Sequence, residues 1–274
     1  MSSIAYISDD KLLENCRLNQ SNTINFWRLS TNINFKEFGI GSLLFFLSKD
    51  KKHQNINKEK GIIGFGKVKD ITISSPEVMW IKYEKINGYN SKQEFFTAIK
   101  KANKDHLIPE KISSLLLENV CFFQNPIYLS ELGINISKSV ESYVYIKNDE
   151  AVINILDYGK DNIDLWSKSD KTDEIIESER IGLVLSLIKN KTNEDSNIIN
   201  DYLKLNPIYS RIDNSLDLYN YFDYNLTIVL YHDEQTNKEE IIERINEYKN
   251  IVAKYYGSAV YIMFKTIDNI EIPD

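Results

Sequence analysis

The first half of the chain alternates short apolar runs with polar breaks. The runs are rich in Ile, Val, Phe, Tyr and Trp, and Gly, Asn, Ser and Lys interrupt them. This composition is typical of β-strands bounded by turns. The pattern predicts strands within residues 24–29, 42–48, 61–68, 78–86, 113–123 and 142–147.

Two segments of the first half carry helical spacing instead. In 8–20, "SDDKLLENCRLNQ", apolar residues recur at helical intervals after an acidic cap. In 90–103, "NSKQEFFTAIKKAN", Ser91 and Glu94 form a capping box, and the apolar residues that follow share one helical face. Strands with one or two short helices between them predict a compact curled sheet or β-barrel.

The second half has longer periodic segments. The pattern predicts a last helix that begins after Thr236 or Asn237 and ends at Gly257. The class is therefore α+β, with a β-barrel domain over 1–148 followed by an α/β domain over 149–274. The elements predicted here are strands at 150–159, 225–233 and 258–267, and helices at 172–192, 194–206 and 236–257.

Composition narrows the class of protein. With 274 residues, 42% of them apolar and 27% charged, the chain suits a globular protein. No apolar run reaches the ~20 residues of a membrane span, and the first residues lack a secretory pattern, so we expect a cytoplasmic protein with no membrane partner. Cys16 and Cys121 each lie in an apolar neighbourhood, which indicates two buried free thiols.

The formal charge of -7 is spread unevenly. Residues 1–150 carry a net +3, whereas residues 151–274 carry -10. A mildly basic front half can meet a phosphate backbone, and an acidic back half repels one. The back half is better suited to a protein partner.

Enzyme signatures are mostly missing. His53, His106 and His232 are far apart and none has metal-ligand spacing, so we expect neither a metal nor a cofactor. The glycines of 61–66 lack a dinucleotide fingerprint and indicate close packing at a bend of a sheet. The segment 231–235, "YHDEQ", could hold a divalent ion, or it could be a solvated loop that leads into the last helix.

Aromatic residues carry more information. Trp27 and Trp80 fall in separate strand-like segments, each beside polar or basic residues. Stacking between aromatic rings holds a base that has left the duplex, although both tryptophans could instead belong to the core. Phe45 and Phe46 are adjacent, so in a strand they face opposite sides, and one leaves the barrel interior unless a helix covers it.

Four segments in order carry a resemblance: "INFWRLSTN", "FGIGSLLFFLSKDKK", "KGIIGFGKVKDITISSPEVMWIKYEKINGYNSKQEFFTAIKK" and "ISSLLLENVCFFQNPIYLSELGI". Residues 22–147 resemble the N-terminal domain of HNH-type restriction endonucleases. That domain is similar to the EVE and YTH members of the PUA-like superfamily, small β-barrels that read modified bases. The chain departs from this pattern at Leu29, where the family tends to have Pro. His232 is the only histidine in residues 151–274, so this part of the chain lacks the paired histidines of an HNH nuclease.

The resemblance implies a reader of modified bases in DNA, as the specificity component of a restriction or antiviral defence system. Its acidic half would bind a nuclease or motor subunit. Trp27 and Trp80 would form aromatic walls, and Ser30, Asn32 or Ser48 would contact the base edge. The implied base pocket comprises Trp27, Ser30, Asn32, Phe46, Ser48, Trp80, Tyr83 and Asn87, and the implied phosphate contacts are Arg28, Lys49, Lys51 and Lys52.

Two alternatives stay open. The back half could be a diverged Mg²⁺-dependent nuclease that uses Asp157, Asp161, Asp233 or Glu234. Otherwise, the chain could be a protein-interaction module that binds no nucleic acid. We expect a binding protein rather than an enzyme, because paired carboxylates with a nearby lysine are missing from the predicted strands.

Overall fold

The structure is a computed structural model that describes residues 2–33, 35–134, 140, 142–166, 168–169, 171–188, 197–233, 236–268 and 271–272. The chain divides into two compact units, Met1–Thr172 and Asp173–Asp274. Unit 1 therefore extends past residue 148, the predicted end of the first domain, and that domain boundary stays a prediction. Among the described helices, none is long and apolar enough to cross a membrane.

Unit 1 contains a six-stranded sheet in the order β2-β5-β4-β3-β1-β6. Neighbouring strands are antiparallel except β1 and β3, which are parallel. Five of the strands overlap predicted runs, whereas β1 was not predicted. The strands are β1 (Ser3–Ser8), β2 (Ile24–Arg28), β3 (Leu43–Ser48), β4 (Ile62–Ser74), β5 (Ile112–Ile127) and β6 (Tyr143–Ile146).

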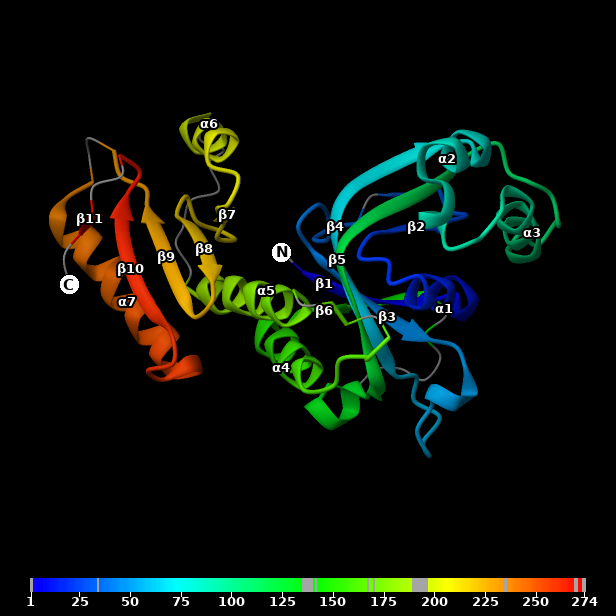
Figure 1. Cartoon of the computed structure of the whole chain (residues 1–274), viewed down its shortest axis with the longest axis horizontal. Coiled ribbons are helices and arrows are strands. Elements are labelled where there is room, and N and C mark those ends of the chain that lie inside the picture. Colours follow the sequence, from blue (N-terminus) through cyan, green and yellow to red (C-terminus); the bar gives the residue numbers. More distant parts are fainter. Residues whose placement is uncertain are drawn as a thin grey trace. The chain divides into compact units, whose positions relative to one another are not determined.

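The sheet curls back on itself. The long strands β4 and β5 lie side by side and bend together (Figure 1), and their register shifts at several points. At one of these shifts Gly64 has φ +155°, and a Cβ there would lie 2.4 Å from the carbonyl oxygen of Cys121, which confirms the close packing predicted for these glycines. Tyr6 of β1 meets Phe26 of β2 at 5.2 Å between ring centroids, although three strands separate β1 from β2 in the sheet. The curled sheet thus encloses a core on its inner face.

Two predicted helices of unit 1 are confirmed, whereas the strand predicted at 78–86 is wrong. Helix α1 (Asp10–Leu18) begins after Asp9, and α3 (Lys92–Ala102) begins after Ser91, whose side chain accepts from the N–H of Glu94. Residues 78–86 form helix α2 (Pro76–Tyr83) and the short helix η2 (Glu84–Asn87) instead of a strand. Ser75 caps this helix and proline at its first position presets φ, so these start signals outweigh the β-rich composition. The other short helices are η1 (Lys51–His53) and η3 (Leu129–Leu132).

The strand predicted at 150–159 is also wrong, because these residues lie in helix α4 (Asp149–Lys160), which Asn148 caps. This helix packs so closely on β5 that a Cβ on Gly159 would lie 2.4 Å from the ring of Phe123. On the same side of the sheet the rings of Phe45, Phe65 and Phe123 follow one another at 6.0 and 6.2 Å. Because α4 covers this side of the sheet, Phe45 is fully buried, as is its neighbour Phe46 on the inner face.

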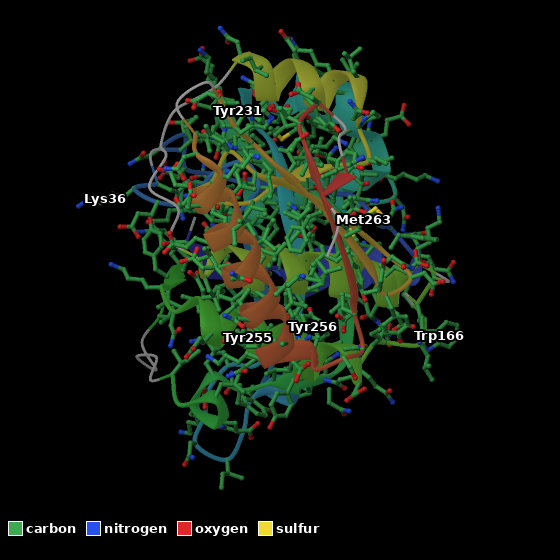
Figure 2. The ribbon with its side chains drawn as sticks, turned by 90° about the vertical axis from the view of Figure 1, so that its left-hand side faces the viewer. Lys36, Trp166, Tyr231, Tyr255, Tyr256 and Met263 are labelled. Carbon is green, nitrogen blue, oxygen red and sulfur yellow. The ribbon has the colours of Figure 1, made fainter. Side chains whose placement is uncertain are left out.

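Unit 2 contains a five-stranded sheet in the order β11-β10-β9-β8-β7 and confirms the strands and helices predicted for 172–267, apart from the parts outside the described residues. Asn237 caps α7 and Gly257 ends it at φ +59°. Figure 2 shows Tyr255 and Tyr256 in the last turn of α7 and Met263 on β10. The elements are α5 (Thr172–Ser186), α6 (Asn197–Leu205), β7 (Ser210–Arg211), β8 (Leu218–Phe222), β9 (Asn225–Leu230), α7 (Lys238–Tyr256), β10 (Tyr261–Thr266) and β11 (Glu271–Ile272).

The α+β class is thereby confirmed, and so are the two thiols: Cys16 and Cys121 are free and buried. Burial raises the pKa of Cys16 to about 12. Its thiol stays protonated at neutral pH, so it serves as an apolar core group rather than a nucleophile.

A buried carboxylate fastens helix α7 to the sheet of unit 2. Asp217 has no exposed surface and accepts hydrogen bonds from Arg244 Nη1 at 2.8 Å, Tyr248 Oη at 3.0 Å and the backbone N–H of Tyr231 at 2.8 Å. Arg244 also donates to the carbonyl of Tyr231. A buried charge is tolerated when it is paired and hydrogen-bonded in this way.

We expect Tyr248→Phe to destabilise unit 2 by about 1–2 kcal/mol, because it removes one hydrogen bond from a buried carboxylate without changing the packed ring. Urea unfolding followed by circular dichroism measures the change. Tyr261→Phe is the matched control, since that side chain on β10 is exposed. Equal unfolding midpoints for the two variants would contradict this role of Tyr248.

Candidate functional site

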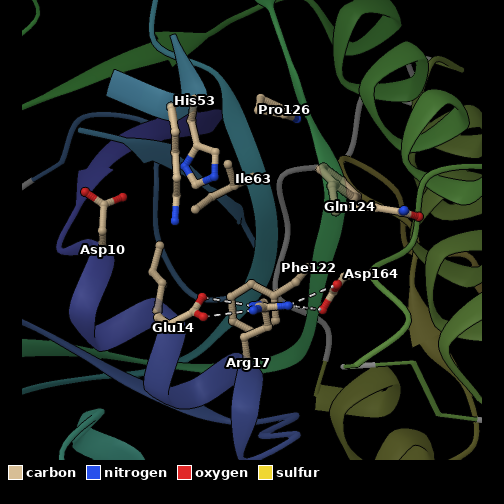
Figure 3. A pocket seen from close by; sticks show the side chains of 12 residues that line it. Asp10, Glu14, Arg17, His53, Ile63, Phe122, Gln124, Pro126 and Asp164 are labelled. Carbon is tan, nitrogen blue, oxygen red and sulfur yellow. Dashed lines mark hydrogen bonds and ion pairs between the residues drawn. The ribbon is translucent and has the colours of Figure 1, made fainter. Parts of the chain in front are cut away.

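Unit 1 contains a polar cleft of about 310 Å³ (Figure 3), which we call the α1 cleft. Charged and polar side chains from α1, η1 and the segment after α4 line one part of it, and apolar side chains from β4 and β5 line the other. The lining residues are Asp10, Leu13, Glu14, Arg17, Lys52, His53, Ile63, Phe122, Phe123, Gln124, Pro126 and Asp164.

The parallel pairing of β1 and β3 creates this site. Ser8 and Ser48 are register partners, so both strands end at the same edge of the sheet. After Ser8 the chain turns into α1, and after Ser48 it turns into η1. The residues that follow the carboxyl ends of neighbouring parallel strands meet there, as in many α/β ligand sites. Asp10 and His53 come together for this reason.

The hydroxyl of Ser48 joins these two side chains. Its Oγ lies 2.5 Å from Asp10 Oδ1 and 2.8 Å from His53 Nδ1, and it accepts the N–H of Asp50 at 3.1 Å. A carboxylate only accepts, so the single hydroxyl proton goes to Asp10. His53 must then donate its Nδ1–H to Ser48, which leaves Nε2 with its lone pair. Ser48 itself is fully buried with its hydrogen-bonding capacity used, so it positions His53 and is no nucleophile.

The surroundings of His53 favour its neutral form. Burial lowers the pKa of His53 below its ordinary 6.5, and the charge of Lys52 lowers it further, against the opposing charges of Asp50, Asp10 and Glu14. At neutral pH the imidazole is therefore uncharged and its Nε2 accepts. Figure 3 shows Asp10, His53 and Ile63 around the cleft.

The far end of the cleft is a closed ion cluster. Arg17 donates from Nη2 and Nε to the two carboxylate oxygens of Glu14, at 2.8 and 3.0 Å, and from Nη1 to both oxygens of Asp164 at 3.2 Å. The hydrogen bond from Arg17 lowers the pKa of Glu14. Every nitrogen of this guanidinium is engaged, so Arg17 braces α1 against the segment after α4 rather than offering a free phosphate site.

Part of the predicted site lies at this cleft. Ser48 holds Asp10 and His53 of the cleft in place, and Lys52 lines the cleft. Lys49 and Lys51 are exposed on the same segment after β3. Lys52 Nζ lies 3.5 Å from Asp50. Sequence reasoning missed Asp10, which it used only as part of a helix cap, and His53, which it dismissed as a lone histidine. The only sequence signal was that each follows a strand end.

Trp27 and Trp80 lie in a different cluster, and Trp80 belongs to helix α2 instead of a strand. Their rings meet on Phe95: Trp27 packs against it edge-on at 5.8 Å between centroids, and Trp80 packs against it at 5.8 Å. Phe95 is fully buried. The two tryptophans are therefore connected through a core ring.

The remaining predicted pocket residues divide between core and surface. Phe46 and Asn87 have no exposed surface, so neither faces an open pocket. Asn87 accepts from Asn25 Nδ2 at 2.8 Å and donates to backbone carbonyls of α2 and η2. Tyr83 is also buried, whereas Ser30 and Asn32 are exposed.

Arg28, a predicted phosphate contact, lies in the curled sheet. It is only 8% exposed and donates from Nε to Tyr6 Oη at 2.9 Å. Its guanidinium carbon lies 5.2 Å from the ring centroid of Tyr6 and 4.8 Å from that of Phe35. The side chain therefore links β2 to β1 through hydrogen bonding and cation–π contact.

The carboxylates of the nuclease alternative are divided between the two units. Asp157 lies in α4 and Asp161 caps its end, both in unit 1, whereas Asp233 in unit 2 accepts from the N–H and hydroxyl of Thr236. Glu234 lies outside the described residues. Within the described ranges, no three His, Cys, Asp or Glu side chains form a group that could hold a metal ion.

Comparison with known proteins leaves the family open. No family model matches the sequence, and no curated protein matches it. Similar solved structures include ASCH from Zymomonas mobilis, with 13% identity over 57% of this chain and 94% of that chain, at a TM-score of 0.40. Two point mutants of the same protein have 12% identity and TM-scores of 0.41, over 57% of this chain and 98% and 95% of theirs. Similarity this low carries no argument, so the EVE- and YTH-like character stays a prediction.

We expect His53 to show the Nδ1–H tautomer at neutral pH and to titrate below pH 6.5, because Ser48 accepts its Nδ1–H and burial penalises the imidazolium. Long-range ¹H–¹⁵N NMR across a pH series measures both. Ser48→Ala should remove the tautomer preference, whereas Ser130→Ala, at a serine whose hydroxyl donates to Glu59, should leave the signal unchanged. A protonated Nε2 in the wild-type protein at pH 7.5 would refute the assignment.

Proposed function

We propose that unit 1 binds nucleic acid and holds one unstacked base in the α1 cleft. The supporting observation is the combination of apolar surface, base-edge hydrogen-bonding groups and a lysine-bearing segment at one cleft. Enzymes and readers that take a base out of the stack need these three elements together.

Each part of the cleft matches one part of a nucleotide. Apolar side chains, among them Ile63, Phe122 and Pro126, suit the face of a base. Asp10 and His53 offer hydrogen-bonding groups to its edge. At about 310 Å³ the cleft lies at the lower end of ligand pockets, roughly 300–1,000 Å³, which favours a single base over a longer stretch.

The lysines after β3 supply the attraction for phosphate. Lys49, Lys51 and Lys52 are exposed on the segment that carries His53. Contacts of this kind are independent of base identity. They weaken as the salt concentration rises, because the release of counterions from the phosphate backbone is then less favourable. They would position the strand while the cleft reads the base.

The base we propose is a modified one in DNA, in keeping with the resemblance of residues 22–147 to modified-base readers. Residues 151–274, with their net charge of -10, would bind a protein partner such as the nuclease or motor subunit of a restriction or anti-phage system. In this proposal the chain supplies specificity and its partner supplies the reaction.

Filling the cleft tests the site. We expect Ile63→Trp to weaken DNA binding by about tenfold or more, since a ring there occupies the space of the base. Ile81→Trp, at an exposed position of α2 outside the cleft lining, is the matched control and should bind as the wild type does. Fluorescence anisotropy gives the affinities, and circular dichroism confirms that both variants fold. An Ile63→Trp variant that folds and binds normally would place the ligand elsewhere, and Trp27→Ala then tests the aromatic cluster.

A panel of duplexes tests the reader function. The wild-type chain should prefer one duplex among unmodified, 5-methylcytosine, 5-hydroxymethylcytosine, glucosylated and 6-methyladenine DNAs, and this preference should survive moderate salt because it resides in a pocket. Weak uniform binding that vanishes with salt would contradict the reader proposal.

A further inference from the structure

Two side chains of the α1 cleft, Asp10 and His53, each keep a hydrogen-bond acceptor. Asp10 uses Oδ1 to accept from Ser48, which leaves Oδ2 as an acceptor. His53 gives its Nδ1–H to the same hydroxyl, which leaves the lone pair of Nε2. Both side chains line the same cleft, and one hydroxyl fixes the orientation of each.

The other charged side chains of the cleft are already engaged. Arg17 holds Glu14 and Asp164 in the closed ion cluster, and Lys52, whose Nζ lies 3.5 Å from Asp50, is the cation that the proposed function assigns to phosphate. Gln124 has an amide that both donates and accepts. The lining therefore offers a bound group more hydrogen-bond acceptors than donors.

We infer that the α1 cleft selects a base with an amino group at C4 or C6, cytosine or adenine, over thymine; this inference rests on the proposed function. An amino group donates two hydrogen bonds, which matches the two acceptors, whereas thymine presents the O4 carbonyl at the same edge. A carbonyl facing Asp10 repels the carboxylate and leaves both acceptors desolvated without a donor, which is the costly case.

The test uses duplexes with one unpaired nucleotide that is cytosine, adenine or thymine, in otherwise identical sequence. The full chain should bind the cytosine and adenine duplexes about tenfold more tightly than the thymine duplex in fluorescence anisotropy at moderate salt. Asp10→Asn should abolish most of this preference, because its amide keeps an oxygen for Ser48 but turns a donor toward the base.

The matched control is Asp9→Asn. It removes the same charge one residue away, at the helix cap, where Asn serves as well as Asp. The Asp9→Asn variant should prefer the cytosine and adenine duplexes as strongly as the wild type does. This result would separate the effect of the Asp10 hydrogen bond from that of a general change in charge.

The outcomes separate the inference from the proposed function. If the wild-type chain binds the three duplexes with equal affinity while Ile63→Trp still weakens binding, the amino-group selection is overturned and base binding in the cleft stands. A preference that persists in Asp10→Asn also overturns it. Binding that Ile63→Trp does not change removes the proposed function together with the inference.

Discussion

The parallel pairing of β1 with β3 is the constraint on which the candidate site depends. An antiparallel neighbour would have placed the end of β1 at the opposite edge from the end of β3, and Asp10 would not have met His53. Parallel neighbours need a long crossover, and the chain uses this crossover for α1 and β2. The same connection thus supplies both the first helix of the cleft and the strand that completes the curled sheet.

Polar side chains in unit 1 have two distinct uses. Arg28 and Asn87 join elements across the core, and their hydrogen bonds are directed at the protein itself. Asp10 and His53 are held in place through Ser48 yet keep acceptors toward a cleft. This difference, more than residue type, favours the α1 cleft over the tryptophan cluster as the place where a base would bind.

Helix α4 shows how tertiary cover changes the role of a strand. Without it, the side of the sheet that carries the rings of Phe45, Phe65 and Phe123 would be open to water. Gly159 lets the helix approach Phe123 closely. The sheet is therefore buried on both faces here, which is why its strands read as continuous apolar runs.

By itself the sequence determined the features whose signals lie within a few residues: an acidic cap before the first helix, the cap at Ser91, a last helix that starts after Thr236 or Asn237 and ends at Gly257, most strands, the buried thiols and the α+β class. Only the tertiary structure decided that Asp10 and His53 form a site, and that Phe95 connects the two tryptophans. The physical reason is that strand pairing and helix packing join segments far apart in the chain. No local pattern of apolar and polar residues specifies which distant strand end will lie beside another.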